Sequence, residues 1–479
     1  MKVILHYLTL SLVLCLASLA TLAQTTPTDE VSIIQSSNLL NTAVGVVRGM
    51  SDDGRRLVFS SFANPVNKNS DGNIEVFVYD TVDRVFIQIT ETVNIPVDPT
   101  DASKGIKTVV SNNRPAISGD GTRIVFSSNS GTLSGANDDG NQEIFLATLP
   151  IGSTTPSFQR ITTTTGNNEF FDNYSPTISF NGSRIAFVTT RSVENGMTGV
   201  NNADNNAEIV LHNIGSGTFT QVTSKLDSEA TRNFTVLGFN SEPQLSGDGN
   251  TLVFLSGFDY AASGATVNNQ DFNGEIYIYK AGDPTNTVTQ VTNTTDNGVQ
   301  PPGGPANLLQ TGVRHLNNSG TLLVFESSGD LESGKNADKS REVFLYRVNA
   351  TTNKFTQITN QTLPANPTVT DIAKLDFGLA PGITPDGTQI FFASVLNLTP
   401  ATTGGILVDN ADGSREIFRY GPINPDGTVP TTAKFRQITF TDLSPLVLDQ
   451  REAIILPNTN SDGTRVVFSS NSDIIRTNP

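Results

Sequence analysis

The chain alternates between polar turns and short apolar runs, and one arrangement of the two recurs seven times. In each copy a turn ending in Gly precedes an apolar run, and a Phe stands five positions after that Gly. The copies are Gly54/Phe59, Gly121/Phe126, Gly182/Phe187, Gly249/Phe254, Gly320/Phe325, Gly387/Phe392 and Gly463/Phe468. Asp-Gly and Asn-Gly pairs before such runs are typical of tight hairpins, because both residues tolerate positive φ. The pattern therefore predicts a repeated β-hairpin.

Two further strand-like runs follow the hairpin in six of the copies. One alternates apolar residues after a Glu, and it starts at Glu75, Glu143, Glu208, Glu275, Glu342 and Glu416. The other ends in Gln or Arg, then Ile or Val, then Thr, at residues 88–90, 160–162, 221–223, 290–292, 357–359 and 437–439. With the hairpin they make four short strands per copy, which we name A to D. Four antiparallel strands repeated every 61 to 76 residues predict an all-β fold, a seven-bladed β-propeller.

The two ends of the chain decide how the last blade is completed. The last copy has the turn motif but neither the Glu strand nor the Gln-Ile-Thr strand. Residues 31–37, within an N-terminal segment at 24–42, resemble a fourth strand. We therefore expect a propeller over residues 43–479 whose last blade is closed by this N-terminal strand and is incomplete, lacking its third strand. The missing strand favours a native chain that continues beyond Pro479.

The repeats resemble a known family, the PD40 or WD40-like propeller repeats of TolB-like proteins. The segments that carry the resemblance are Thr384-Pro385-Asp386-Gly387, Phe392-Ala393-Ser394, Glu416-Ile417-Phe418 and Arg436-Gln437-Ile438-Thr439. It covers essentially all of residues 43–479. The chain has no room for the α/β domain that precedes the propeller in TolB itself. The resemblance implies a propeller fold, and it leaves the function open because propellers serve many unrelated tasks.

Residues 1–23 have the pattern of a secretory signal peptide. Lys2 supplies the positive charge, an apolar stretch runs from residue 8 to 20, and small residues lead to a cleavage site after Ala23. Cleavage there would remove Cys15, the single Cys of the chain, so the mature protein would contain no disulfide. Lipid attachment at Cys15 is the less favoured alternative, because apolar residues continue beyond it. We expect a bacterial protein that is periplasmic, secreted or exposed at the cell surface.

The net charge of the chain limits the kinds of partner that it can bind. The chain has 30 Lys and Arg residues against 46 Asp and Glu residues, a net charge of −16. This balance argues against nucleic acid as a partner and favours cations or basic protein surfaces. Beyond the signal segment no run approaches the ~18 consecutive apolar residues that a membrane helix requires. We expect a monomer that binds a protein partner and has no transmembrane segment after cleavage.

The loops between strands B and C contain the one pattern with metal-binding chemistry. Six of these loops place Asn, Asp and Glu at positions 1, 3 and 7: Asn69/Asp71/Glu75, Asn137/Asp139/Glu143, Asn202/Asp204/Glu208, Asn269/Asp271/Glu275, Asn336/Asp338/Glu342 and Asn410/Asp412/Glu416. Oxygen side chains in a tight loop are ligands that calcium accepts. The competing interpretation is structural, because Asn and Asp also stabilise turns through their own backbone. Both interpretations stay open, and no cofactor is required by either.

No catalytic constellation accompanies the repeats. His212 and His315 stand singly on predicted strands, where a histidine is more often packed than catalytic, and no Gly-x-Ser-x-Gly segment occurs. Long loops on a rigid scaffold are where binding usually resides. We therefore expect an exported, non-catalytic scaffold that contacts a protein partner through the acidic face formed by the B–C loops and D–A crossovers. The alternatives are a calcium-binding surface protein and the propeller part of a periplasmic hydrolase or lyase with carboxylates along the axial channel.

Overall fold

The computed structural model describes the strands and part of the connections between them. The described residues are 12–16, 30–34, 43–44, 49–97, 100, 106–135, 137–166, 172–192, 196–226, 240–260, 269, 273–283, 287–294, 314–338, 340–362, 380–398, 415–439 and 455–469. The chain divides into two compact units. We call Leu39–Val291 the central unit, and Met1–Asn38 together with Thr292–Pro479 the terminal unit.

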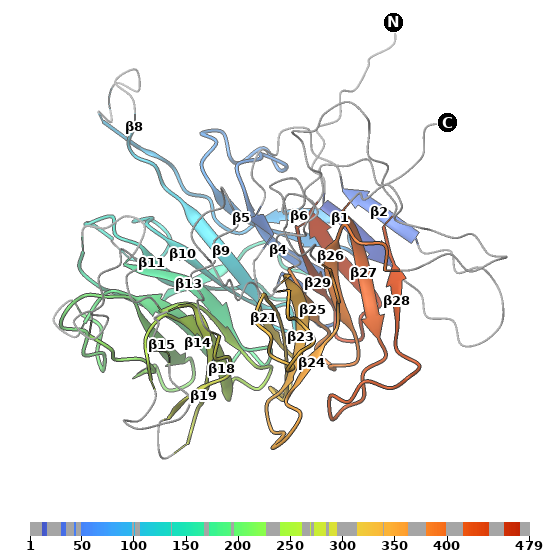
Figure 1. The fold of residues 1–479 in the computed structure, drawn as a ribbon. Coiled ribbons are helices and arrows are strands. Elements are labelled where there is room, and N and C mark those ends of the chain that lie inside the picture. The colour runs from blue at the N-terminus through green and yellow to red at the C-terminus, as the bar shows by residue number, and fades with distance from the viewer. Residues whose placement is uncertain are drawn as a thin grey trace, which may run out of the picture. The chain divides into compact units, whose positions relative to one another are not determined.

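The central unit contains four antiparallel blades of four strands each (Figure 1). They are β3 (Ala43–Val44), β4 (Arg56–Ser61), β5 (Glu75–Asp80) and β6 (Val85–Gln88); β9 (Asn112–Ile117), β10 (Arg123–Ser128), β11 (Glu143–Thr148) and β12 (Ser157–Arg160); β13 (Asn173–Ile178), β14 (Arg184–Thr189), β15 (Glu208–Asn213) and β16 (Thr218–Gln221); and β17 (Asn240–Leu245), β18 (Thr251–Ser256), β19 (Glu275–Lys280) and β20 (Val288–Gln290). In each blade the strands pair in chain order, as a meander of hairpins does.

The terminal unit contains two further blades of the same kind. They are β21 (Arg314–Leu316), β22 (Leu322–Ser327), β23 (Glu342–Arg347) and β24 (Phe355–Gln357), followed by β25 (Gly382–Ile383), β26 (Ile390–Ser394), β27 (Glu416–Gly421) and β28 (Lys434–Gln437). Among the described residues there are thus six blades that each consist of four consecutive strands.

The prediction of a seven-bladed propeller with an incomplete last blade is wrong. The seventh turn motif forms a hairpin, β29 (Ile455–Thr459) and β30 (Arg465–Ser469), and the described residues contain no strand after β30. It lies instead in a four-stranded sheet of order β2-β1-β30-β29, with β1 (Leu12–Leu16) and β2 (Glu30–Ile34) from the other end of the chain. The apolar β1 pairs antiparallel with β30. The sequence assigned these residues to a signal peptide, so no strand was expected there.

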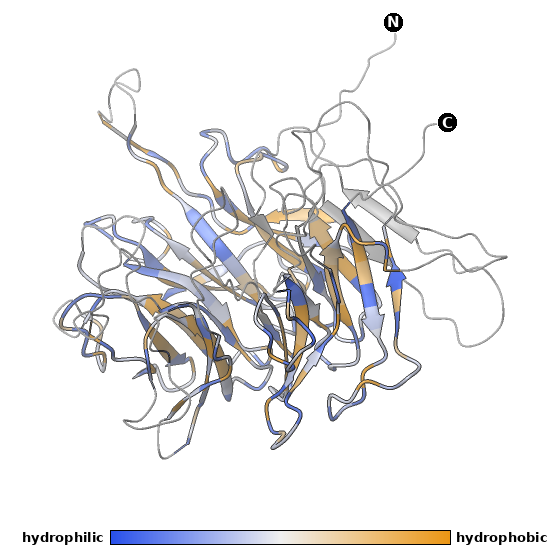
Figure 2. Cartoon of the chain, in the orientation of Figure 1, coloured by the Kyte–Doolittle hydropathy of each residue, from blue (hydrophilic) through white to orange (hydrophobic). Residues whose placement is uncertain are grey.

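The Phe of the turn motif is the centre of each blade core. Phe59, Phe126 and Phe325 are fully buried and stack on the Phe that stands opposite on strand C, at ring-centroid distances of 5.7, 5.8 and 5.9 Å. Figure 2 shows the same division along the chain, with apolar residues concentrated in the strands. Burial of an aromatic pair against the next blade supplies the apolar contact that a single four-stranded sheet lacks.

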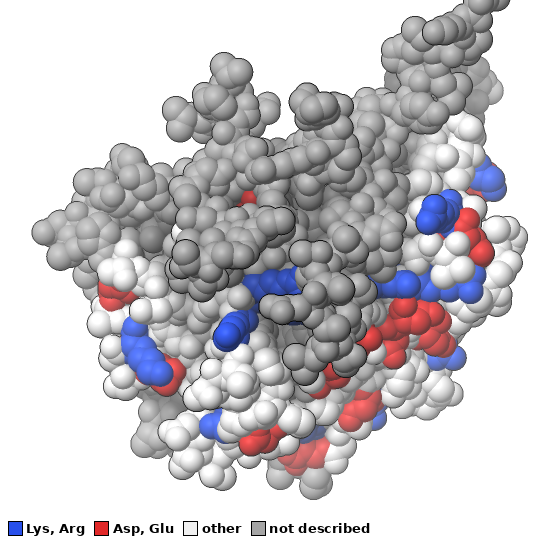
Figure 3. All heavy atoms as spheres, turned by 90° about the vertical axis from the view of Figure 1, so that its right-hand side faces the viewer, with Lys and Arg blue, Asp and Glu red and all other residues white. Residues whose placement is uncertain are grey.

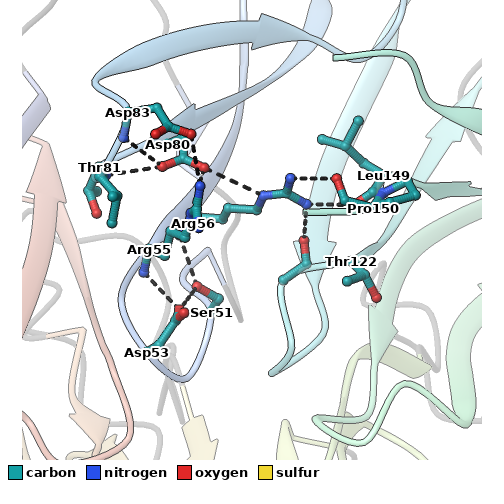
Figure 4. A network of polar contacts seen from close by, with 12 residues as sticks. Ser51, Asp53, Arg55, Arg56, Asp80, Thr81, Asp83, Thr122, Leu149 and Pro150 are labelled. Carbon is teal, nitrogen blue, oxygen red and sulfur yellow. Dashed lines mark hydrogen bonds and ion pairs between the residues drawn. The ribbon is translucent and has the colours of Figure 1, made fainter. Parts of the chain in front are cut away.

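Adjacent blades of the central unit are also joined by the side chain of Arg56. This residue stands two positions after the turn glycine, is buried, and reaches the second blade (Figure 4). Its Nη1 donates to the carbonyl oxygens of Gly121 and Leu149 at 2.9 and 2.5 Å, and its Nη2 donates to that of Pro150 at 2.8 Å. Arg184, at the same place in the third blade, donates to Gly249 O at 2.9 Å. In these two blades the Arg of the turn motif therefore connects its blade to the next one through hydrogen bonds to backbone carbonyl oxygens.

The crossover from the first to the second blade carries an extra two-stranded sheet. Its strands are β7 (Ile95–Pro96) and β8 (Ile106–Thr108), which pair antiparallel. In Figure 1 this arm runs outward beyond the end of β9. Among its described side chains, Ile95 and Lys107 are exposed and Thr108 is half-buried.

Candidate functional site

The Glu of each B–C loop is buried and bound by its own blade. Glu75 begins β5 and has no measurable exposure. Thr90 Oγ1 donates to its Oε2, and Thr92 donates to its Oε1 twice, from N at 2.7 Å and from Oγ1 at 2.8 Å. Asn112 Nδ2, on the first strand of the next blade, donates to Oε2 at 3.0 Å. Four donors thus occupy the carboxylate oxygens of Glu75.

This network recurs and accounts for the Thr of the Gln-Ile-Thr motif. The donors are Thr162, Thr164 and Asn173 for Glu143, Thr359, Ser340 and Gln361 for Glu342, and Thr439 for Glu416. Asn240 donates to Glu208 at 3.2 Å. In each case the Glu links the start of strand C to the end of strand D. The Glu side chains are therefore turned into the protein rather than toward the loop surface.

Burial changes the acidity of these carboxyl groups. Desolvation raises the pKa of Glu75 above its ordinary value, and the hydrogen bonds from Thr90 and Thr92 offset part of the rise. Desolvation raises the pKa of Glu143 to about 7 and that of Glu208 to about 8. Glu143 and Glu208 therefore titrate near neutral pH, although both side chains are buried.

The Asn at the first loop position is a buried brace. Asn69 Nδ2 donates to the carbonyl oxygens of Phe62, Ala63 and Asn73, at 3.2, 3.2 and 2.9 Å. The equivalent amides, Asn137, Asn202, Asn269 and Asn336, each donate to the carbonyl four residues later at 2.8 Å. This i to i+4 bond holds the loop closed.

The Asp at the third position is the exposed acidic group of the loop. Asp71 and Asp139 are exposed, and each uses one oxygen to accept a backbone N–H, from Asn94 at 2.7 Å and from Gly166 at 2.8 Å. Asp338 is exposed and accepts from Ser340, while Asp204 is half-buried. Asp271, Asn410 and Asp412 lie outside the described residues. The structure thus separates the three predicted ligand types: Asn and Glu inside, Asp outside.

The fifth position of the B–C loop pattern also carries a functional side chain, an Asn that the sequence pattern of Asn, Asp and Glu did not include. Asn73 Nδ2 donates to Thr92 O at 3.1 Å and to Thr92 Oγ1 at 2.9 Å, and Asn141 does the same to Thr164. Asn206 donates to Lys225 O. The signal was present, because Asn recurs four residues after the first Asn in four of the six loops. The loop pattern is therefore Asn-x-Asp-x-Asn-x-Glu, with oxygen-bearing side chains at positions 1, 3, 5 and 7.

A line of strained residues on the innermost strands is a second site that sequence reasoning missed. Arg114, Ser175 and Glu242 each precede a Pro and have positive φ, of 50°, 51° and 49°. They coincide with register shifts between strands A and B, and Arg114 Nη1 donates to Ser175 Oγ at 2.7 Å. Strain of this kind is often found where backbone supports function. β9, β13 and β17 contribute one carboxylate, Glu242, to this line.

The two histidines are separate from these loops. His212 lies on β15, is buried, and packs against Phe219 with 4.6 Å between the ring centroids. Burial lowers the pKa of His212 to about 4. His315 lies on β21.

In the described parts of the chain, no three His, Cys, Asp or Glu side chains are grouped to hold a metal ion. No helix in these parts is long and apolar enough to cross a membrane. On the face drawn in Figure 3, Lys and Arg side chains lie among the Asp and Glu side chains, so the charge of this face is mixed.

Comparison with known proteins identifies propellers by shape alone. No family model and no curated protein matches the chain. Among solved structures it is similar to TolB from Acinetobacter baumannii, with 14% identity over 88% of this chain and 81% of that one, and a TM-score of 0.34. It is similar to the β-propeller domain of the Trilobed protease from Pyrococcus furiosus (11% identity, 91% and 99% coverage, TM-score 0.42). It is also similar to oligogalacturonate lyase from Vibrio parahaemolyticus (12%, 80% and 91%, 0.38). These neighbours include TolB and two propellers from enzymes, and identities this low bear on fold and not on activity.

Proposed function

We propose that the protein is an exported, non-catalytic scaffold that binds a protein partner through the face of the B–C loops and D–A crossovers. In an antiparallel four-stranded blade the B–C and D–A connections leave from the same end of the strands, so they share a face. The exposed Asp71, Asp139 and Asp338 of the B–C loops lie at that end. The proposal assigns this face to a partner with a basic and apolar surface.

The observation that carries the proposal is the distribution of exposed apolar side chains. Of nine large hydrophobic residues that are exposed in the described chain, seven lie between residues 62 and 109. Five of these belong to the B–C and D–A side of the first blade: Phe62, Val93, Ile95, Val97 and Val109, with exposed fractions of 41, 69, 43, 53 and 51%. Isolated exposed hydrophobic residues are ordinary, but a group on one arm and its neighbouring loop is typical of an interaction surface.

Alternation along the arm supports the same conclusion. Thr92 and Asn94 are buried against the blade, whereas Val93, Ile95 and Val97 between and beyond them are exposed. In an extended segment successive side chains point to opposite sides, so the three apolar residues share one face. Val109 joins them from the returning strand segment. Asp71, whose carboxylate accepts from Asn94 N, places a negative charge beside this face.

Site-specific photocrosslinking in the producing cells tests the proposal. A photoreactive residue at Val97, on the arm, should give a discrete adduct with one partner protein. The matched control is Val82 in the C–D turn, which is 61% exposed but lies at the opposite end of the strands. Adducts of equal yield at both positions, or none at Val97, would contradict a partner on the loop face.

Export is a separate part of the proposal. The strand β1 lies inside residues 1–23, so removal of a signal peptide and the pairing of β1 with β30 exclude each other. The intact mass of the native protein distinguishes the two states. A mass that starts at Gln24 supports export, and retention of residues 1–23 would contradict cleavage.

A further inference from the structure

We propose that the Asn-x-Asp-x-Asn loops of the central unit bind calcium through the oxygens at positions 1, 3 and 5, and that the buried Glu at position 7 is not a ligand. In the first blade the ligands are Asn69 Oδ1, an oxygen of Asp71 and Asn73 Oδ1. This site does not depend on the partner-binding function. It differs from the Asn, Asp and Glu set suggested by spacing, because Glu75 is already bound by Thr90, Thr92 and Asn112.

The first argument is that the buried side-chain oxygen of Asn69, Oδ1, accepts no hydrogen bond from any described residue. Asn69 is 4% exposed, and among the described residues no donor reaches its buried Oδ1. Its amide orientation is fixed, since Nδ2 faces three carbonyl oxygens that can only accept. Exchange of the amide nitrogen and oxygen would place an oxygen against those three carbonyls. The Oδ1 therefore points away from them, and a buried acceptor without a donor is rare unless water or an ion occupies its place.

Asn73 repeats this arrangement two positions after Asp71. Its Nδ2 donates to Thr92 O and Oγ1, which fixes the amide, and its buried Oδ1 has no donor within the described chain. The bond from Asn69 Nδ2 to Asn73 O, at 2.9 Å, holds residues 69 and 73 together with Asp71 between them. Two neutral oxygens and one carboxylate are thus placed in a single turn of the chain.

The loop backbone has space at this position. Gly72 has a φ of +67°, and no atom lies within 4 Å of the place where a Cβ would stand. Asp71 uses Oδ2 to accept from Asn94 N, which leaves its second oxygen for a ligand. Gly140 has the same φ of +67° and the same open space in the second loop.

Two further loops show the same buried acceptors. In the second loop Asn141 Oδ1 is buried without a donor from the described residues, and Asp139 is exposed beside it. In the third loop both Asn202 Oδ1 and Asn206 Oδ1 are in this state, with Asp204 between them. Their nitrogens donate to carbonyl oxygens, so these amides too are fixed in orientation. One orphaned acceptor could be accidental, but five at equivalent positions in three loops indicate a shared ligand.

The ligand chemistry favours calcium over other cations. Calcium takes six to eight oxygen ligands in flexible geometry and accepts amide and carbonyl oxygens, whereas magnesium keeps most of its water. At positions 1, 3 and 5 each loop supplies a single carboxylate, and no group of three His, Cys, Asp or Glu side chains that could hold a metal ion exists in the described chain. Sites with so little charge bind weakly, with dissociation constants on the order of 10⁻⁴ to 10⁻³ M.

Thermal unfolding of the full chain with calcium, and counting of bound calcium by equilibrium dialysis, test this inference. We expect calcium at ~10 mM to raise Tm by about 2 to 4 °C for each occupied site. Asp71→Asn should lower the bound calcium by one ion per chain and remove part of this rise. Asp52→Asn, an exposed aspartate in the A–B turn, is the matched control and should retain all bound ions.

Glu75→Gln separates the two ligand sets. If Glu75 is structural, this variant unfolds at lower temperature but binds the same number of calcium ions as the parent. Loss of one ion with Glu75→Gln would instead support the set that includes the Glu. Equal stabilisation by magnesium, or by calcium in Asp71→Asn, would show screening of the net charge and overturn the site. Absence of any bound calcium would assign the buried Oδ1 atoms to water.

Discussion

Asn112 of the second blade donates a hydrogen bond of 3.0 Å to Glu75 of the first, inside the protein. The same Asn112 Nδ2 also reaches Ile74 O at 2.8 Å and Thr92 Oγ1 at 2.9 Å. One amide therefore ties strand A of a blade to strands C and D of the blade before it. The Glu of the acidic loop pattern, which from the sequence could be a surface ligand, is therefore a buried hydrogen-bond acceptor that connects two blades.

The hydrogen bond between Asn112 and Glu75 predicts energetic coupling between the two blades. Glu75→Gln and Asn112→Ala should each lower the free energy of unfolding by about 1 to 3 kcal/mol, because each leaves buried polar groups without partners. In a double-mutant cycle the two should couple by at least about 0.5 kcal/mol. Chemical denaturation followed by fluorescence or circular dichroism measures all four species.

Asn113 provides the control for that cycle. It neighbours Asn112 but donates to Ser111 Oγ at 2.6 Å and is only half-buried. Asn113→Ala should be additive with Glu75→Gln. Additivity between Asn112→Ala and Glu75→Gln would show that the hydrogen bond between the blades contributes nothing.

Glu143 and Glu208 predict a loss of stability as the pH rises toward 8. Burial raises their folded-state pKa values to about 7 and about 8, above the ordinary value of 4.5. A group whose pKa is higher in the folded state binds more protons there, so its contribution is complete below pH 4.5. That contribution declines between pH 4.5 and the folded-state pKa, so the decline ends near pH 7 for Glu143 and near pH 8 for Glu208. Urea midpoints measured from pH 4.5 to 9 should therefore fall up to about pH 8 and then level off.

Variants assign this loss to the two residues. Glu143→Gln should remove one share of the decline between pH 4.5 and about 7, and Glu208→Gln one share of the decline between pH 4.5 and about 8. The pH at which each share ends is an internal check, since both substitutions neutralise the same type of group. A pH profile that neither substitution alters would contradict the assignment.

His212 predicts the opposite slope on the acid side. Its pKa is lowered by burial from 6.5 to about 4, so the unfolded state binds more protons between these values. Its contribution to stability is complete above pH 6.5 and is lost as the pH falls toward 4. His212→Phe should flatten the stability profile between pH 6.5 and 4, as measured by thermal unfolding. Between pH 6.5 and 8 the difference between variant and parent should stay constant, and a difference that changes there would implicate another group.

The strands were predictable because their signals are local. The offset from Gly121 to Phe126, and the alternation that follows Glu143, fix a turn and a pleated strand within a few residues. The partners of Glu143 were not predictable from such signals. Thr162, Thr164 and Asn173 stand 19 to 30 residues away, and only the folded blades bring them together.

The strand β1 was not expected from the sequence, for a different physical reason. The residues of β1, Leu-Val-Leu-Cys-Leu, are apolar without alternation, and such a run fits a signal peptide as well as a buried strand. Its pairing with β30 at the other end of the chain cannot be read from either segment alone. The predicted number of blades was wrong because of this pairing between the two ends of the chain, whereas the six repeats with four consecutive strands formed blades as expected.

We predict that the hydrogen bonds of Arg56 between the first two blades of the central unit contribute substantially to stability. Arg56→Met keeps much of the side-chain volume but removes donors from three carbonyl oxygens, those of Gly121, Leu149 and Pro150. Leaving buried acceptors unsatisfied should cost about 2 to 3 kcal/mol in the free energy of unfolding. The control is Lys68→Met, which removes an ammonium group that pairs with Glu91 where both side chains are exposed. Exposed pairs contribute little, so this control should stay within about 0.5 kcal/mol of the parent protein. Denaturation midpoints that are equal for the two variants would show that Arg56 fills space between the blades without joining them.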